Sequence, residues 1–268
     1  MTGSAQAGGL RVVQVKYGER MVNKSDVFYD YGSYGLPDGQ LHMEYNFWVI
    51  RDGERVMLLD TGYDIPARDW LGEIPVVLTP DGLSLLEIDP REVSMVITSH
   101  FHYDHIGYLA LFENATVVSG AAEYEYWFGK WRANQLEGEF TVAEHLEAVK
   151  KAEDEGRLRL IDAQAEVYPG ITVYPVGGHC PGELLTLARS ASGPLILAAD
   201  AAHFYEQIDN EWPFFAFTDL GEMRRALSFI NRLAVDEGAA VVPGHDGRVR
   251  QRFSPLDGPA GDIATVLG

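Results

Sequence analysis

Three histidines and one aspartate fall within six consecutive positions of this sequence, from His100 to His105. His100 and His102 are two residues apart, so in an extended backbone their side chains point the same way and can hold one metal ion. Asp104 and His105 follow a turn and face a second position. Imidazole suits zinc and other borderline divalent ions, and a carboxylate offsets their positive charge. The spacing therefore predicts a metal-chelating loop rather than a polar loop with solvated histidines.

Further ligands of the same kinds lie far away in the chain, each shortly after an apolar run. His179 follows VYPVGG, Asp200 follows LILAA, and His245 follows VVPG. Each of them alone could equally be a structural residue, but their shared placement at strand ends favours ligands. Because strand ends at one rim of a sheet sandwich can converge on a pocket, we expect all three to join the chelating loop in a two-metal site.

The elements that would position these residues follow from the spacing of apolar residues. Short β-branched or aromatic runs bounded by turn residues predict strands. These runs are 10–18, 45–50, 55–62, 94–99, 171–178, 193–200 and 239–246. Apolar residues at helical spacing, ending at a glycine, predict helices over 141–156 and 220–238, and a short helix is expected within 83–93. Strands and helices alternate without a linker or repeat, so we expect one α/β domain over 1–268, with 1–9 as a flexible tail.

The amino-acid composition limits the kinds of partner that the protein is expected to bind. The 268 residues include 40 acidic and 21 basic side chains, a formal charge of −19, which disfavours nucleic acid and anionic membranes. No stretch approaches the ~20 apolar residues of a membrane span, and no export signal is evident. Cys180 is the single cysteine, so no internal disulfide can form. We expect a soluble, cytoplasmic protein.

Five motifs, in this order along about residues 10 to 250, resemble those of the metallo-β-lactamase fold superfamily. They are LLDTG, SHFHYDHIG, GGHCPGE, AADAAH and PGHDG. The resemblance implies an αββα sandwich with a binuclear metal centre at one edge. It assigns the first metal to His100, His102 and His179, the second to Asp104, His105 and His245, the bridging position to Asp200, and the support of a ligand to Asp60.

Within the superfamily the chain looks most like the N-acyl homoserine lactone lactonases. The stretches FYDYGSYGLPDGQLHMEYNFWVI, MVITSHFHYDHIG and LAADAAHFYEQIDNEWPFFAF carry this likeness. It implies two divalent ions per chain, most simply zinc, with manganese, cobalt or iron as alternatives. Tyr103 stands where relatives place an aromatic residue beside the substrate. His203 stands where those lactonases have a tyrosine, and Tyr205 lies two residues further on.

The expected chemistry is hydrolysis of a small-molecule lactone. Two ions sharing one water lower its pKa toward about 7, and the resulting bridging hydroxide attacks the ester carbonyl. Asp104 would carry the proton to the leaving oxygen, and His203 would hydrogen-bond the carbonyl or the leaving group. His42 and His145 are expected to be structural or surface residues, with His145 on the exposed side of its helix. Cys180 is expected to point away from the ligands as a small buried filler.

The pocket and the reaction class leave alternatives open. Aromatic residues gather at 44–48, 124–131 and 211–217, where they would form either an apolar lid or ordinary core and dimer interface. A homodimer is compatible with these residues, and the substrate could be an acyl homoserine lactone or an aromatic lactone. The rival functions are a thioesterase of the glyoxalase II type, another ester hydrolase of this fold, and an iron-dependent oxidoreductase.

Overall fold

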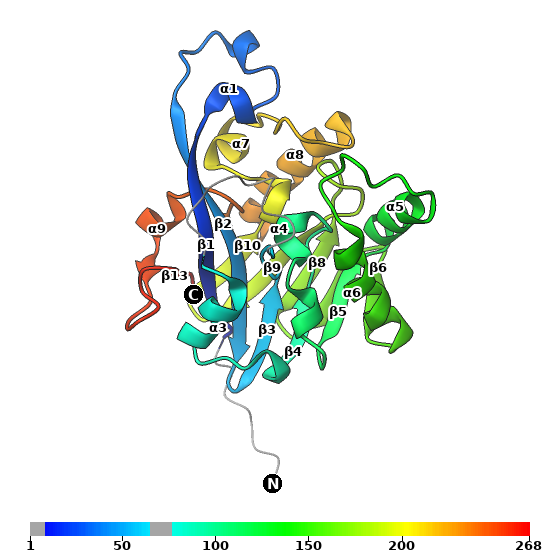
Figure 1. The fold of residues 1–268 in the computed structure, drawn as a ribbon. Coiled ribbons are helices and arrows are strands. Elements are labelled where there is room, and N and C mark those ends of the chain that lie inside the picture. The colour runs from blue at the N-terminus through cyan, green and yellow to red at the C-terminus, as the bar shows by residue number, and fades with distance from the viewer. Residues whose placement is uncertain (1–8, 65–76) are drawn as a thin grey trace.

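Two β-sheets face each other in the computed structural model, which describes residues 9–64 and 77–268 (Figure 1). In this part of the chain the first sheet has 8 strands, in the order β12 (Ser254–Pro255), β13 (Ala264–Val266), β1 (Arg11–Asn23), β2 (Gln40–Asp52), β3 (Arg55–Leu59), β4 (Val93–Ile97), β5 (Thr116–Gly120) and β6 (Leu158–Ile161). The second has 5, in the order β11 (Ala240–Val242), β10 (Gly193–Leu197), β9 (Leu184–Ser190), β8 (Ile171–Pro175) and β7 (Ala165–Tyr168). Residues 1–8 of the expected tail lie outside the described residues.

The described α-helices are α1 (Lys24–Val27), α3 (Thr79–Leu85), α4 (Tyr103–Ile106), α5 (Ala121–Arg132), α6 (Ala143–Asp154), α7 (Tyr205–Asn210), α8 (Leu220–Glu237) and α9 (Val249–Arg252). Helices α3, α5 and α6 lie against the first sheet and α8 lies against the second, while the other described helices lie at the ends and edges of the sheets (Figure 1). The predicted helices over 141–156 and 220–238 are confirmed as α6 and α8. The helix expected within 83–93 instead begins at Thr79, because Pro80 favours the first helical turn, and ends at Leu85.

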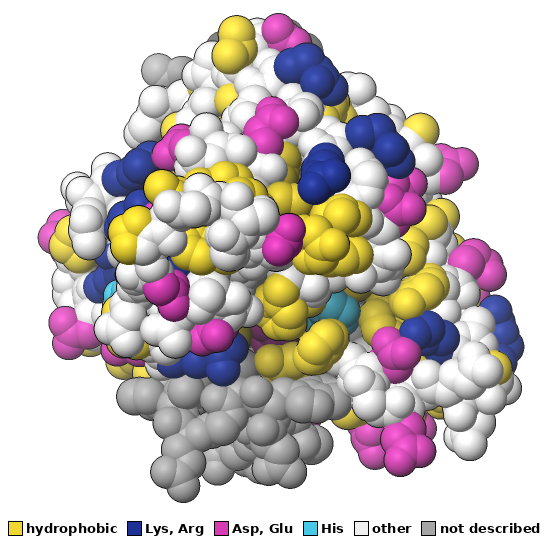
Figure 2. All heavy atoms as spheres, turned by 90° about the horizontal axis from the view of Figure 1, so that it is seen from above, with side chains coloured by type: hydrophobic (Ala, Val, Ile, Leu, Met, Phe, Trp, Pro, Cys, Tyr) yellow, Lys and Arg dark blue, Asp and Glu magenta, His cyan; other side chains and the backbone are white. Residues whose placement is uncertain are grey.

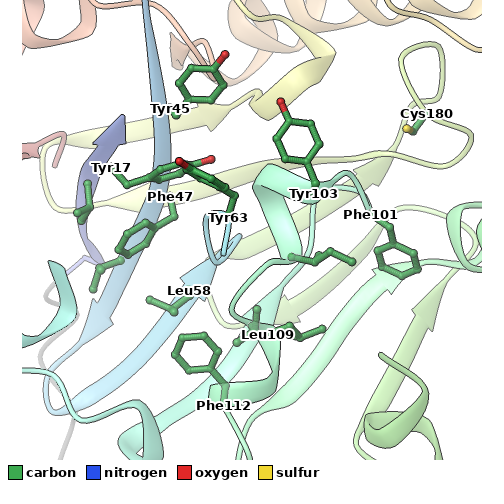
Figure 3. Packing of buried hydrophobic residues seen from close by; sticks show 14 of the residues in the cluster. Tyr17, Tyr45, Phe47, Leu58, Tyr63, Phe101, Tyr103, Leu109, Phe112 and Cys180 are labelled. Atoms are coloured by element: carbon green, nitrogen blue, oxygen red, sulfur yellow. The ribbon is translucent and has the colours of Figure 1, made fainter. Parts of the chain in front are cut away.

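Strand alternation builds two separate cores. In β2, Phe47 and Val49 join the core on the outer side of the first sheet, whereas Trp48 and Ile50 join the core between the sheets. Strand β3 alternates in the same way. Figure 3 shows part of the outer core, where the Tyr17 ring packs against Tyr45, Phe47 and Tyr63.

The outer core also receives Leu146 and Val149 of α6 and Trp127 of α5. Leu227 and Ile230 of α8 pack on the outer side of the second sheet, whose buried residues join this layer to the core between the sheets. The layers are therefore helix, sheet, sheet, helix, and the predicted αββα sandwich is confirmed. In the described residues no helix combines enough length and apolarity to cross a membrane.

Candidate metal centre

The predicted ligands come from loops that leave the same edge of the two sheets. Asp60 follows β3, the chelating loop follows β4, Asp200 follows β10 and His245 follows β11. His179 lies in the loop between β8 and β9. The structure brings all of these residues together, although they span more than half of the sequence.

The first group contains the three histidines predicted for one metal. The ring centroids of His100 and His102 lie 4.5 Å apart, and His102 Nδ1 lies 3.0 Å from His179 Nε2. One ligand atom from each of these residues, together with Cys180 Sγ, falls within 4.8 Å of the others. All four side chains are buried. This geometry is compatible with one metal ion.

The second group contains Asp104, His105 and His245. Their ligand atoms also lie within 4.8 Å of one another, and all three side chains are buried. His105 Nε2 is 3.6 Å from Asp104 Oδ2. His100 and His102 of the loop thus lie in the first group, and Asp104 and His105 lie in the second. One ligand atom of His105 also lies within 4.8 Å of those of His100 and Asp200.

Asp200 lies between the two groups. Its Oδ2 is 3.3 Å from His179 Nε2 and 3.8 Å from His100 Nε2. Its Oδ1 is 2.9 Å from His245 Nε2 and 3.3 Å from His105 Nε2. Each oxygen of one carboxylate therefore faces a different ligand group.

Neighbouring polar groups hold the ligands in orientation. Asp60 adopts a left-handed backbone with φ 62°, and its Oδ1 accepts from the Ser99 N–H at 2.7 Å. Its Oδ2 lies 2.8 Å from His105 Nδ1, which leaves Nε2 for the centre. His245 Nδ1 donates to the Glu44 carbonyl at 2.7 Å in the same way. The supporting contact predicted for Asp60 is thus present.

Burial and mutual proximity set the ionisation of these groups. Burial, together with neighbouring imidazoles, holds the pKa of His100 and that of His102 well below the ordinary value. Burial opposes ionisation of Asp200, but the imidazoles of His203, His105 and His245 hold its pKa well below the usual range. Neutral imidazoles and an ionised carboxylate are the forms that bind metals.

The donor set fits divalent metals. Nitrogen and carboxylate oxygen suit zinc and related ions, and His100 Nε2 is a buried atom without a hydrogen-bond partner among the described residues. A buried polar atom without a partner is costly unless something else satisfies it. A metal ion at the first group would do so.

A cavity of about 220 Å³ opens onto the ligands. Tyr103 and His203 line it, together with Met43, Phe140, Phe214 and Phe215. Seen from above, a histidine lies at the centre of a hollow framed by hydrophobic side chains (Figure 2). Of the aromatic stretches, 211–217 contributes to this wall, whereas Tyr124, Trp127 and Phe128 of 124–131 are buried in the outer core. Tyr205 does not line the cavity, since its ring packs under Arg252.

The structure corrects two of the predictions. His145 is buried rather than exposed, and its Nε2 lies 2.9 Å from Asp64 Oδ1, because α6 packs against the loop that follows β3. Cys180 is buried, as predicted, but its Sγ lies 3.2 Å from His102 Nε2. The extended backbone assumed for it is absent, because Gly177 and Gly178 take positive φ values of 70° and 109°.

Gly107 ends the chelating loop where two backbones meet. Its N–H donates to Gly62 O at 2.8 Å, and an added Cβ would lie 2.5 Å from Asp64 N. We expect Gly107→Ala to lower the free energy of unfolding by about 1–3 kcal/mol, because neither backbone can move aside cheaply. Urea denaturation measures this. The matched control is Gly129→Ala in α5, where an added Cβ meets nothing within 4 Å; equal midpoints for the two variants would refute the close contact.

The fold and this arrangement of candidate ligands are typical of a class of metal-dependent proteins. Comparison with known proteins supports the assignment to this class. The sequence profile of the metallo-beta-lactamase superfamily matches residues 43–245, which is most of the chain. The protein belongs to the metallo-β-lactamase superfamily.

Its relatives include N-acyl homoserine lactonases, as the motifs predict. It is 33% identical over 236 residues to N-acyl homoserine lactonase AttM of Azorhizobium caulinodans, covering 79% of this chain and 85% of that one. It is 32% identical over 164 residues to an N-acyl homoserine lactonase of a Bacillus species, covering 59% of this chain and 58% of that relative, so this match spans less than two thirds of it. The fold is shared with AidC, described as a dizinc quorum-quenching lactonase, with a TM-score of 0.68, 18% identity and coverage of 89% and 88%.

Proposed function

We propose that this protein is a lactonase, a hydrolase that opens a lactone ring with two divalent metal ions. The observation that carries the proposal is the Asp200 carboxylate, whose Oδ2 faces His179 and whose Oδ1 faces His245. One carboxylate can thus serve both ions. The lactonase relatives support the choice of a lactone as substrate.

The metal ions would be held by the two ligand groups, with Asp200 shared. The first group is His100, His102 and His179, and the second is Asp104, His105 and His245. Five histidines and two aspartates accept zinc, manganese, cobalt or iron. We propose zinc, because AidC is described as a dizinc lactonase.

When bound, such ions polarise a carbonyl and lower the pKa of a water from near 16 toward about 7. Asp104 lies at the floor of the cavity, and the Tyr17 hydroxyl donates to its carbonyl at 2.5 Å, which fixes its backbone. We propose that its carboxylate takes a proton from the attacking water and passes it to the leaving ring oxygen. Tyr103 lines the same cavity and would contact the substrate.

The cavity wall suggests which lactone binds. Its apolar side chains Met43, Phe140, Phe214 and Phe215 favour an acyl chain, and Arg20 is the cationic side chain of the same wall. We therefore propose N-acyl homoserine lactones as substrates.

A pH-indicator assay tests the function. The purified protein, with its metal content measured, is given acyl homoserine lactones, aromatic γ-lactones and thioesters, and His102→Ala serves as the control. Acid release from acyl homoserine lactones that is lost in the control supports the proposal. Acid release from aromatic lactones alone would support the lactonase activity but change the proposed substrate. Turnover of thioesters alone would overturn the proposed function.

His203 is proposed to act on the reaction through Asp200. Its ring stacks on Phe214 with centroids 3.5 Å apart, and its Nε2 lies 3.1 Å from Asp200 Oδ2. Burial lowers the pKa of His203 to about 3, so near neutral pH it is an uncharged donor. We expect His203→Ala to lower kcat/KM by about 10–100-fold, as for other residues that orient a metal ligand. Steady-state kinetics with measured metal content check this, and unchanged turnover would show that His203 has no role.

We further propose a cytoplasmic location. Cys180 is a free, buried thiol, and a chain without disulfides suits a reducing compartment. That the protein forms a homodimer stays a prediction.

A further inference from the structure

Glu123 has a fully buried carboxyl group that belongs to neither ligand group. It lies in the first turn of α5 with 0% of its surface exposed. Its Oε1 accepts two hydrogen bonds, from the Phe101 backbone N–H at 2.7 Å and from Trp127 Nε1 at 2.7 Å. Burial of such a group is costly unless hydrogen bonds compensate for the lost water, and these two contacts do so for Oε1.

The first of these bonds acts on the chelating loop itself. Phe101 lies between His100 and His102, and its side chain is fully buried in the outer core (Figure 3). Its backbone N–H is held by Glu123 from the neighbouring helix. The short segment that joins two metal ligands is therefore fixed by both its side chain and its backbone.

The second bond acts on the His102 ring. The Trp127 indole, oriented by Glu123, meets that ring edge to face with centroids 5.6 Å apart. On another side, Cys180 Sγ lies 3.2 Å from His102 Nε2. His102 Nδ1 faces His179 across the first ligand group. A metal ion bound through Nδ1 would leave the ring proton on Nε2, which would then donate toward the sulfur. Contacts with Trp127 and Cys180 thus fix the orientation in which Nδ1 faces the centre.

The second ligand group is held by different residues. Asp60 orients His105, and the Glu44 carbonyl orients His245. Neither contact involves Glu123. A change at Glu123 therefore acts directly on only one half of the centre.

We propose that Glu123 is a positioning residue that, with Trp127 and Cys180, holds His102 in its metal-binding orientation. These contacts would determine how tightly the first metal ion is retained, without acting directly on the second. This inference rests on the proposed two-metal centre, but it concerns metal binding and not lactone turnover. If the metal-loaded protein opened no lactone, the proposed function would fail while this inference could still hold.

The test compares metal release in Glu123→Ala, Glu123→Gln and the wild-type protein. Each zinc-loaded protein is dialysed against graded concentrations of chelator, and the zinc per chain is measured. We expect Glu123→Ala to lose about one of its two ions at a roughly 10–100-fold lower chelator concentration than wild type, with the other ion retained. Glu123→Gln keeps an oxygen acceptor of the same shape and is expected to restore retention of that ion. Loss of both ions together, or release like wild type, would overturn the proposal.

Two further variants serve as controls. Glu125→Gln, on the exposed side of the same helix, is the matched control and should release metal like wild type. In a His102→Ala background, Glu123→Ala should change metal release no further, since both act through one ligand. An additional loss there would mean that Glu123 acts elsewhere.

If Glu123→Ala does not fold, Trp127→Phe takes its place, because it removes the indole donor and keeps an aromatic ring. The visible spectrum of the cobalt-loaded variant then reports the coordination geometry of each site. Compared with wild type, the bands of the first site should change and those of the second should not. An unchanged spectrum with unchanged metal release would overturn the role assigned to Glu123 and Trp127.

Discussion

Removal of bound metal is expected to abolish lactone opening and to lower the melting temperature by roughly 10 °C. A ligand present at about 1,000 times its Kd stabilises a folded protein by about 4 kcal/mol, and each kcal/mol shifts the midpoint of a domain of 150–250 residues by about 2–4 °C. The ligand groups here are buried, and the ring centroids of His100 and His105 lie only 4.1 Å apart. Without metal, these closely packed polar groups lose their main compensation.

Calorimetry before and after chelation measures the effect, and the metal content of each sample is determined in parallel. Adding zinc back should restore both the midpoint and the turnover. An unchanged midpoint in protein shown to be free of metal would contradict a structural contribution from the metals.

Asp200→Asn is expected to lower kcat/KM by at least about 10³-fold, which is about 4 kcal/mol at 1.36 kcal/mol per tenfold. The amide keeps the shape of the carboxylate but removes the negative charge that faces both ligand groups. The amide also places an N–H where a carboxylate oxygen now faces one of the two ligand groups. The variant should therefore bind both metals more weakly.

Steady-state kinetics and metal analysis of the same preparation check this prediction. Asp209→Asn, an exposed position in α7, is the matched control and should behave like wild type. If Asp200→Asn kept turnover within about threefold and bound the same metal, Asp200 would not be the shared ligand.

The sequence was sufficient to predict the layers of the fold and the clustering of the seven candidate ligands. The predicted strand runs cover β8, β10 and β11 but extend past their ends, and His179, Asp200 and His245 lie in the loops just beyond these strands. Strand ends at one edge of a sandwich must meet, so His179, Asp200 and His245 could be placed without knowing the loops. The predicted helices at α6 and α8 had one apolar face each, which made them easy to recognise.

The residues around the ligands were harder to predict, because their contacts join segments far apart in the chain. Glu123 contacts Phe101 across 22 positions, and no local pattern distinguishes it from an exposed helix carboxylate. His145 looked exposed because its partner Asp64 lies 81 positions away in the sequence. Cys180 was misplaced because the turn made by Gly177 and Gly178 redirects the backbone before it.

The most direct test of a two-metal lactonase is a titration of the metal-free protein with zinc while the opening of N-hexanoyl homoserine lactone is followed. We predict that turnover rises with added metal and saturates near two ions per chain, and that Asp200→Asn shows no such rise. Saturation near one ion, or no lactone opening with two ions bound, would contradict the proposed function.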